Sequence, residues 1–158
     1  MKCLSQILDE ARAVYTLSPS CAKAVGYGRT ERQDPNRDLW YVQERVMSHD
    51  KKVLITRSFT TNQSGGVRDT RCGQGAIHLY VGSEQDRSDL EFDLLDPAAT
   101  AKLEERLMIV FAPVFRGHEA AKESLRKERE AAAAQLRAES QEFEKQRTDR
   151  AYKLAESI

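Results

Sequence analysis

Residues 96–117 decide the fold, and they read DPAATAKLEERLMIVFAPVFRG. Asp96 and Pro97 are a helix start, because a carboxylate that can cap the helix precedes the residue best tolerated at the first helical position. The apolar residues between 103 and 111 recur at helical spacing and give the helix one apolar side. We therefore predict a core helix over residues 97–112, ended by Pro113 and Gly117.

The remaining residues, 118–158, predict a second and very different helix. They contain neither proline nor glycine, and alanine, glutamate, glutamine, lysine and arginine dominate them, all of which are strong helix formers. At ~1.5 Å per residue this helix extends roughly 60 Å. The sequence thus indicates an α+β globular domain over residues 1–116 and a long charged helical arm over residues 117–158.

Upstream of residue 96 the pattern changes to alternation. Apolar and polar residues alternate in four strand candidates, and the short connections between these candidates favour antiparallel pairing. The first candidate also fits a helical period, but its aromatic and β-branched content favours a strand. The four candidates are residues 39–47, 53–60, 76–81 and 88–94.

Helical spacing returns near the N-terminus, over residues 6–17, with Ser5 as the expected N-cap. A short helix over residues 21–25 follows, and residues 26–38 are polar with turn chemistry. We predict an α+β fold in which a four-stranded antiparallel sheet is packed by the N-terminal helix and the helix over 97–112. The long C-terminal helix follows.

Composition limits the function classes. The chain has 158 residues with 25 basic and 25 acidic side chains, and this balance makes nucleic-acid binding and anionic-membrane binding unexpected. No signal peptide and no membrane span is expected, and three widely spaced cysteines without a CxxC pair indicate reduced thiols in a cytoplasmic protein. We expect no cofactor and no metal site.

The arm carries the first candidate site, a partner or oligomer interface. Its few large apolar residues fall close to one stripe, and the steps from Leu125 to Leu136 and from Phe143 to Leu154 are both eleven residues. An eleven-residue step gives a straight or slightly right-handed stripe, unlike the heptads of a left-handed coiled coil. The alternative is a solvated charged helix. The interface hypothesis names Leu125, Ala132, Leu136, Phe143 and Leu154.

The second candidate site is the glycine-rich stretch over residues 61–75. Arg68 and Arg71 stand among Gly65 and Gly66 there, and arginine forks with backbone N–H groups can hold a phosphate or carboxylate. The alternative is a mobile connection with solvated charges, since no phosphate-loop motif is present.

Two weaker patterns favour a structural role. The acidic residues Asp89, Glu91 and Asp93 alternate along the last strand candidate and are expected to pair with bases such as Arg45 or Arg57. The histidines at 49, 78 and 118 share no ligand spacing, so a catalytic role would need a partner that folding brings near.

A lone cysteine and a basic region give two further weak patterns. Cys72 has no neighbour that lowers its pKa and is read as a bystander. A basic and aromatic region over residues 23–71 could clamp a nucleotide or single-stranded nucleic acid, but Trp40 is expected in the core and acidic residues dilute the patch.

Nothing in the sequence forms a catalytic set. We therefore expect a non-enzymatic binding or assembly protein that self-associates, or docks a protein partner, through its C-terminal helix. The alternative is a protein that binds or sequesters a phosphate- or nucleotide-bearing small ligand in the 61–75 loop, as an inhibitor or modulator of a larger system.

Overall fold

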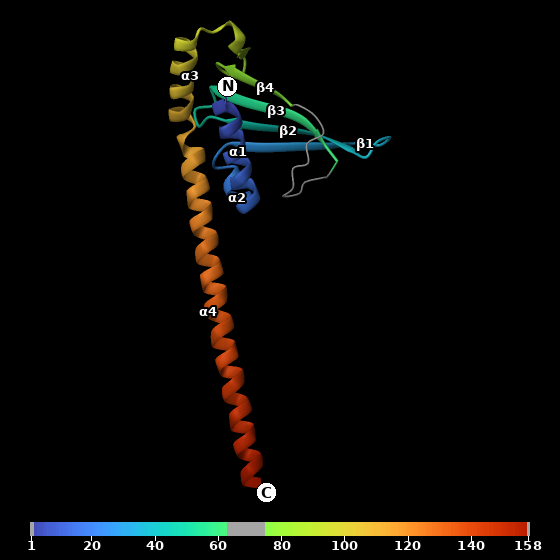
Figure 1. Cartoon of the computed structure of the whole chain (residues 1–158), viewed down its shortest axis with the longest axis vertical. Coiled ribbons are helices and arrows are strands. Elements are labelled where there is room, and N and C mark those ends of the chain that lie inside the picture. Colours follow the sequence, from blue (N-terminus) through green and yellow to red (C-terminus); the bar gives the residue numbers. More distant parts are fainter. Residues whose placement is uncertain (1, 63–74, 158) are drawn as a thin grey trace. The chain divides into compact units, whose positions relative to one another are not determined.

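The computed structural model describes residues 2–62 and 75–157 and has an α+β fold (Figure 1). The helices are α1 (Lys2–Leu17), α2 (Pro19–Ala22), α3 (Pro97–Val110) and α4 (Ala112–Ser157), with a 3₁₀ turn η1 (Phe92–Leu94). The strands are β1 (Tyr27–Asp34), β2 (Leu39–Met47), β3 (Val53–Thr61), β4 (Ala76–Val81) and β5 (Ser88–Asp89).

The strands pair in chain order into one antiparallel sheet, β1-β2-β3-β4-β5. The predicted fold class is thus confirmed, although the described residues form five strands where four were expected. The register places Arg29 of β1 opposite Glu44 of β2, and Glu44 opposite Arg57 of β3. Three charged residues therefore stand side by side across the centre of the sheet.

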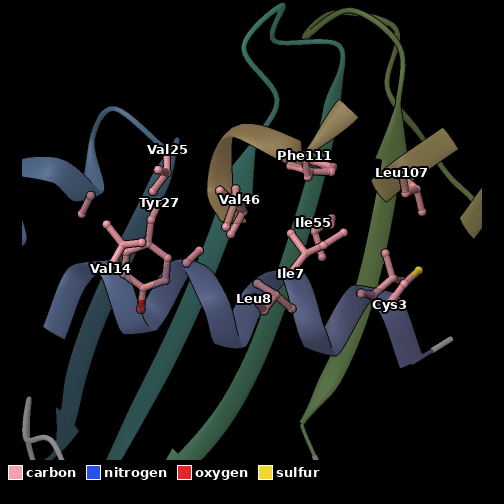
Figure 2. Close-up of a cluster of buried hydrophobic side chains, with 14 of the residues drawn as sticks. Cys3, Ile7, Leu8, Val14, Val25, Tyr27, Val46, Ile55, Leu107 and Phe111 are labelled. Carbon is pink, nitrogen blue, oxygen red and sulfur yellow. The ribbon is translucent and has the colours of Figure 1, made fainter. Parts of the chain in front are cut away.

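One face of the sheet carries the core. Helix α1 crosses this face and contacts β1, β2 and β3 (Figure 2). Its buried positions recur every three or four residues, as expected of an amphipathic helix, and α3 contacts α1. The largest fully buried apolar side chains are Leu4, Ile7, Leu8, Val14, Val46, Ile55, Leu79, Phe111 and Val114.

The stretch over 26–38, expected to be irregular, contains strand β1. On the core face of the sheet, β1 contributes Tyr27, Arg29 and Glu31, which lie on the same side as Val46 and Glu44 of β2. The prediction failed because two of these three residues are charged. Charged side chains replace the apolar ones that alternation depends on, so the strand has no hydrophobic period.

The predicted strand over 88–94 was wrong beyond Asp89. The N–H of Leu90 still donates to the carbonyl of Leu79 at 2.9 Å, and the chain then turns into η1. Leu90 and Phe92 both pack against the core. The alternation of the sequence therefore reflects two core contacts made through a turn, and the expected row of three carboxylates on a strand does not form.

The helix predicted over 97–112 is α3. The carboxylate of Asp96 accepts a hydrogen bond from the N–H of Ala99 at 2.6 Å, which confirms the cap. The break, however, lies at the buried Phe111, and α4 begins at Ala112. Pro113 is tolerated because the first turn of a helix has no intrahelical acceptor for its missing N–H.

Gly117 lies inside α4 for a packing reason. A Cβ at this position would approach Cγ1 of Val25 to 2.4 Å. Glycine here lets α4 approach the segment before β1 closely.

The N-terminal helix begins earlier than expected. Helix α1 starts at Lys2, so Ser5 lies within the helix and does not cap it, and Cys3 and Leu4 before it are buried. The short second helix ends at Ala22.

The chain divides into two compact units, Met1–Ala121 and Lys122–Ile158. The first ten residues of α4 belong to the first unit and pack there, where Val114 and Ala121 are buried and His118 Nδ1 bonds Glu10 Oε2 of α1. Among the described residues, no helix is both long and apolar enough to cross a membrane.

Candidate functional site

The apolar residues of the second unit are open to solvent. Leu136, Phe143 and Leu154 are 66%, 65% and 66% exposed on α4, and Leu125 is partly buried while Ala132 is exposed. Eleven residues of α-helix turn through about three whole turns, so side chains spaced by eleven lie nearly above one another. The five residues form one stripe, which we call the arm stripe.

The rest of this unit is charged. Arg126 bridges Glu123 and Glu130 at 2.5 Å each, and Arg147 lies 3.7 Å from Glu144. These pairs join residues three or four apart and support the helix. A helix this polar gains little from packing of its own, so a surface that buries the arm stripe would stabilise it.

The predicted ligand loop cannot be placed. Gly65, Gly66, Arg68 and Arg71 lie outside the described residues, as does Cys72.

The most elaborate polar arrangement is one that the sequence did not reveal, around the fully buried Glu44 of β2. Arg12 of α1 donates to both carboxylate oxygens, at 2.6 Å from Nε to Oε2 and 2.5 Å from Nη2 to Oε1. The hydroxyl of Tyr27 donates to Oε2 at 2.8 Å and Nε of Arg57 donates to Oε1 at 3.0 Å. We call these residues, with Arg29, the Glu44 cluster.

A second layer surrounds the cluster. Nη1 of Arg57 donates to Asp9 at 2.9 Å, and Nε of Arg29 donates to Glu31 at 2.8 Å. The guanidinium carbons of Arg12 and Arg29 lie 5.3 Å and 5.8 Å from the centre of the Phe59 ring, a cation–π arrangement. Each cation of the cluster is therefore matched by a carboxylate or a ring.

The charges around Glu44 fix the protonation states of Glu44 and Tyr27. Burial opposes ionisation of Glu44, but the hydrogen bonds and charges of Arg12 and Arg57 outweigh it and hold the pKa of Glu44 below its ordinary value. Burial, together with the Glu44 charge, raises the pKa of Tyr27. Glu44 is thus the anion and Tyr27 the neutral donor at neutral pH.

The cluster joins α1 to three strands. Because Glu44 accepts from α1, β1 and β3 at once, it fixes the helix on the sheet in one position. Its sequence signal was weak but present: Glu44 occupies a core-facing position between Val42 and Val46 in the alternation of β2.

Two histidines do gain carboxylate neighbours on folding. His78 Nδ1 lies 2.7 Å from Oδ2 of Asp89, and His118 bonds Glu10. Asp89 was expected to pair across strands with a base such as Arg45 or Arg57, and its partner is His78 of the neighbouring strand β4. Arg57 pairs with Glu44 and Asp9. No group of three metal-binding side chains occurs among residues 2–62 and 75–157.

The basic and aromatic region over 23–71 is split between the two faces of the sheet. Tyr27 and Arg29 belong to the Glu44 cluster, whereas the Arg32 guanidinium lies 5.1 Å from the Tyr41 ring centre, at strand positions that alternate with the cluster's. Trp40 is only partly buried and lies outside the core cluster. The structure does not bring these residues into one patch.

A cavity of about 760 Å³ lies at one end of the sheet. Its walls come from the segment between α2 and β1, the β2–β3 hairpin and the junction of α3 and α4. Apolar lining is supplied by Val25, Met47, Phe111 and Val114. We call it the junction cavity.

Comparison with known proteins gives little likeness. No family model matches the chain, and no solved structure matches it. A stretch of 90 residues, 55% of the chain, is 27% identical to a mitochondrial amino-acid acetyltransferase of Aspergillus terreus (strain NIH 2624 / FGSC A1156). The chain covers 13% of that protein, so the likeness concerns a small part of it.

Proposed function

We propose that this chain is a non-enzymatic assembly protein, in which the arm stripe of one copy packs against the arm stripe of a second copy. The observation that carries the proposal is the exposure of Leu136, Phe143 and Leu154, each about two-thirds open to solvent on an otherwise charged helix. Large apolar side chains aligned on one side of an exposed helix are typical of a surface that another helix covers.

The spacing defines the geometry of the pairing. Steps of seven and four residues alternate from Leu125 through Ala132 and Leu136 to Phe143. This eleven-residue repeat keeps two helices in contact with little supercoiling, or with a slight right-handed one. Ala132 gives the two backbones room to approach.

The energetics favour a weak, concentration-dependent assembly. Complete burial of a leucine or phenylalanine side chain contributes about 1.5–3 kcal/mol, so two-thirds of that is roughly 1–2 kcal/mol. The three exposed residues of two copies then supply roughly 6–12 kcal/mol, against an association cost of about 4–15 kcal/mol. We expect dissociation in the micromolar range or above.

Light scattering during size-exclusion chromatography tests the proposal. The wild-type mass should rise towards a multiple of 17.9 kDa as the loaded concentration increases from micromolar to hundreds of micromolar. The double variant Leu136→Asp/Phe143→Asp should stay at the monomer mass, because charged side chains would then face each other across the interface.

Ala134→Asp/Ala138→Asp is the matched control. It adds the same charge to α4 on the side away from the arm stripe, since residues two positions from 136 are turned by about 160°. This control should associate as the wild type does. A monomeric wild type at hundreds of micromolar, or equal loss of association in both double variants, contradicts the proposal.

A further inference from the structure

We propose that the junction cavity binds a small ligand in which an anionic group is attached to an apolar body. This site is independent of the arm stripe and of the assembly proposed above, because every lining residue lies in the first unit. A volume of about 760 Å³ falls within the range of small-molecule sites.

The apolar part of the ligand would meet a rigid wall. Met47, Val110 and Pro113 line the cavity and are partly exposed, whereas Phe111 and Val114 beside them are buried and held in place by the core. Wall residues that do not reorganise lower the entropic cost of binding.

The anionic part would meet unpaired cations. Lys23, Arg45 and Lys51 all line the cavity, with Glu84 as the one carboxylate and His49 beside them. Within the described residues, none of the three cations forms an ion pair with a carboxylate, whereas Arg12, Arg29 and Arg57 of the Glu44 cluster all do. An excess of cations over carboxylates around a concave surface favours an anionic ligand.

Gly28 positions the arginine of this site. A Cβ on Gly28 would lie 2.8 Å from Nε of Arg45, so glycine allows the Arg45 side chain to lie across β1. A guanidinium held there presents two parallel N–H donors, which suit a phosphate, carboxylate or sulfonate.

Paired probes test the charge requirement. 1-Anilinonaphthalene-8-sulfonate carries a sulfonate, and N-phenyl-1-naphthylamine has the same rings without it. Fluorescence titration of the full chain should show saturable binding of the sulfonate probe at one site per chain, at least tenfold tighter than the neutral probe. Equal affinities, or no saturable binding of the sulfonate probe, would overturn the proposal.

Substitutions locate the site. Arg45→Gln should weaken binding of the sulfonate probe about tenfold, the usual effect of losing one charge-assisted hydrogen bond. Gly28→Ala should weaken it as well, because the added Cβ displaces Arg45 without removing its charge. Arg32→Gln is the matched control: Arg32 is an exposed sheet arginine that does not line the cavity.

The outcomes are distinguishable from those of the assembly test. Binding should persist in Leu136→Asp/Phe143→Asp, whereas a loss there would assign the probe to the arm stripe and overturn the proposal. An equal loss in Arg45→Gln and Arg32→Gln would indicate general surface charge and overturn it too. Unchanged unfolding curves for each variant show that the fold is intact.

Discussion

Removing the charge of Glu44 should destabilise the first unit strongly. We expect a larger effect than from any other single substitution that replaces one polar side chain of this unit by another. In Glu44→Gln the side chain keeps its size, but the amide nitrogen would face the N–H groups of Arg12 or Arg57. The side chains of Arg57, Arg29 and Arg12 are only 3%, 10% and 17% exposed. They cannot turn to water without disturbing the contact between α1 and the sheet.

The magnitude follows from the burial. Breaking a buried ion pair by removing one partner costs about 3–5 kcal/mol, because the remaining charge is left without compensation. Domains of this size are stable by about 5–15 kcal/mol. The substitution should therefore remove a large part of the free energy of unfolding of the first unit.

Urea unfolding followed by tryptophan fluorescence measures this effect. Trp40 is the only tryptophan in the sequence and lies in β2, so its signal reports the sheet and not α4. Glu123→Gln is the matched control, because Glu123 is an exposed α4 residue paired with Arg126, and it should leave the midpoint unchanged. A loss of less than about 1 kcal/mol for Glu44→Gln would refute the reasoning, since the cluster would then not depend on its central charge.

Two further predictions concern the same unit. The pKa of Glu44 is lowered by folding, so its contribution to stability is complete above the unfolded value of about 4.3 and is lost as pH falls through the folded value below it. The stability difference between wild type and Glu44→Gln should accordingly be constant from pH 7 to about pH 5 and shrink below, and a difference that grows on acidification would contradict the assignment. At Gly117, alanine should destabilise the wild type by about 1 kcal/mol because of the clash with Val25, but should stabilise a Val25→Ala background by up to about 1 kcal/mol through helix propensity. The urea midpoints of the wild type, Gly117→Ala, Val25→Ala and the double variant test this. A stability change of the same sign for Gly117→Ala in both backgrounds would show that the contact with Val25 is not the cause.

Much of the architecture could be predicted from local pattern. Strands β2, β3 and β4 were found because their core-facing positions are mostly apolar, and α3 because Asp96 and Pro97 mark its start. In these elements, local propensity and tertiary burial agree.

The secondary-structure predictions were wrong in two places. In one the buried face of a strand is polar, and in the other a turn has the alternating sequence pattern of a strand. Strand β1 was missed because Arg29 and Glu31 occupy positions that an apolar residue would have revealed. The Glu44 cluster could not be predicted because its members are up to 45 residues apart in sequence, from Arg12 to Arg57, and only the register of three strands brings them together. The strand predicted over 88–94 is wrong beyond Asp89 because Leu90 reaches the core directly after β5 and Phe92 reaches it from the 3₁₀ turn η1.

The junction cavity was equally hidden. Its cations come from the segment before β1, from β2 and from the β2–β3 hairpin, and sequence alone gives no sign that Lys23, Arg45 and Lys51 line one cavity. The arm stripe, in contrast, needed only a helix and a spacing, so its members could be named in advance; its role as an interface stays a prediction.

The Glu44 cluster also bears on how relatives of this chain could be recognised. Four side chains from three elements surround one carboxylate, so a change of Glu44 leaves several buried donors unmatched and a change of any of the four removes a partner of Glu44. We therefore expect homologues either to keep all five residues of the Glu44 cluster or to replace them together. Arg12, Tyr27, Arg29, Glu44 and Arg57, at spacings of 15, 2, 15 and 13 residues, form a sparse signature that could identify distant homologues when overall identity no longer does.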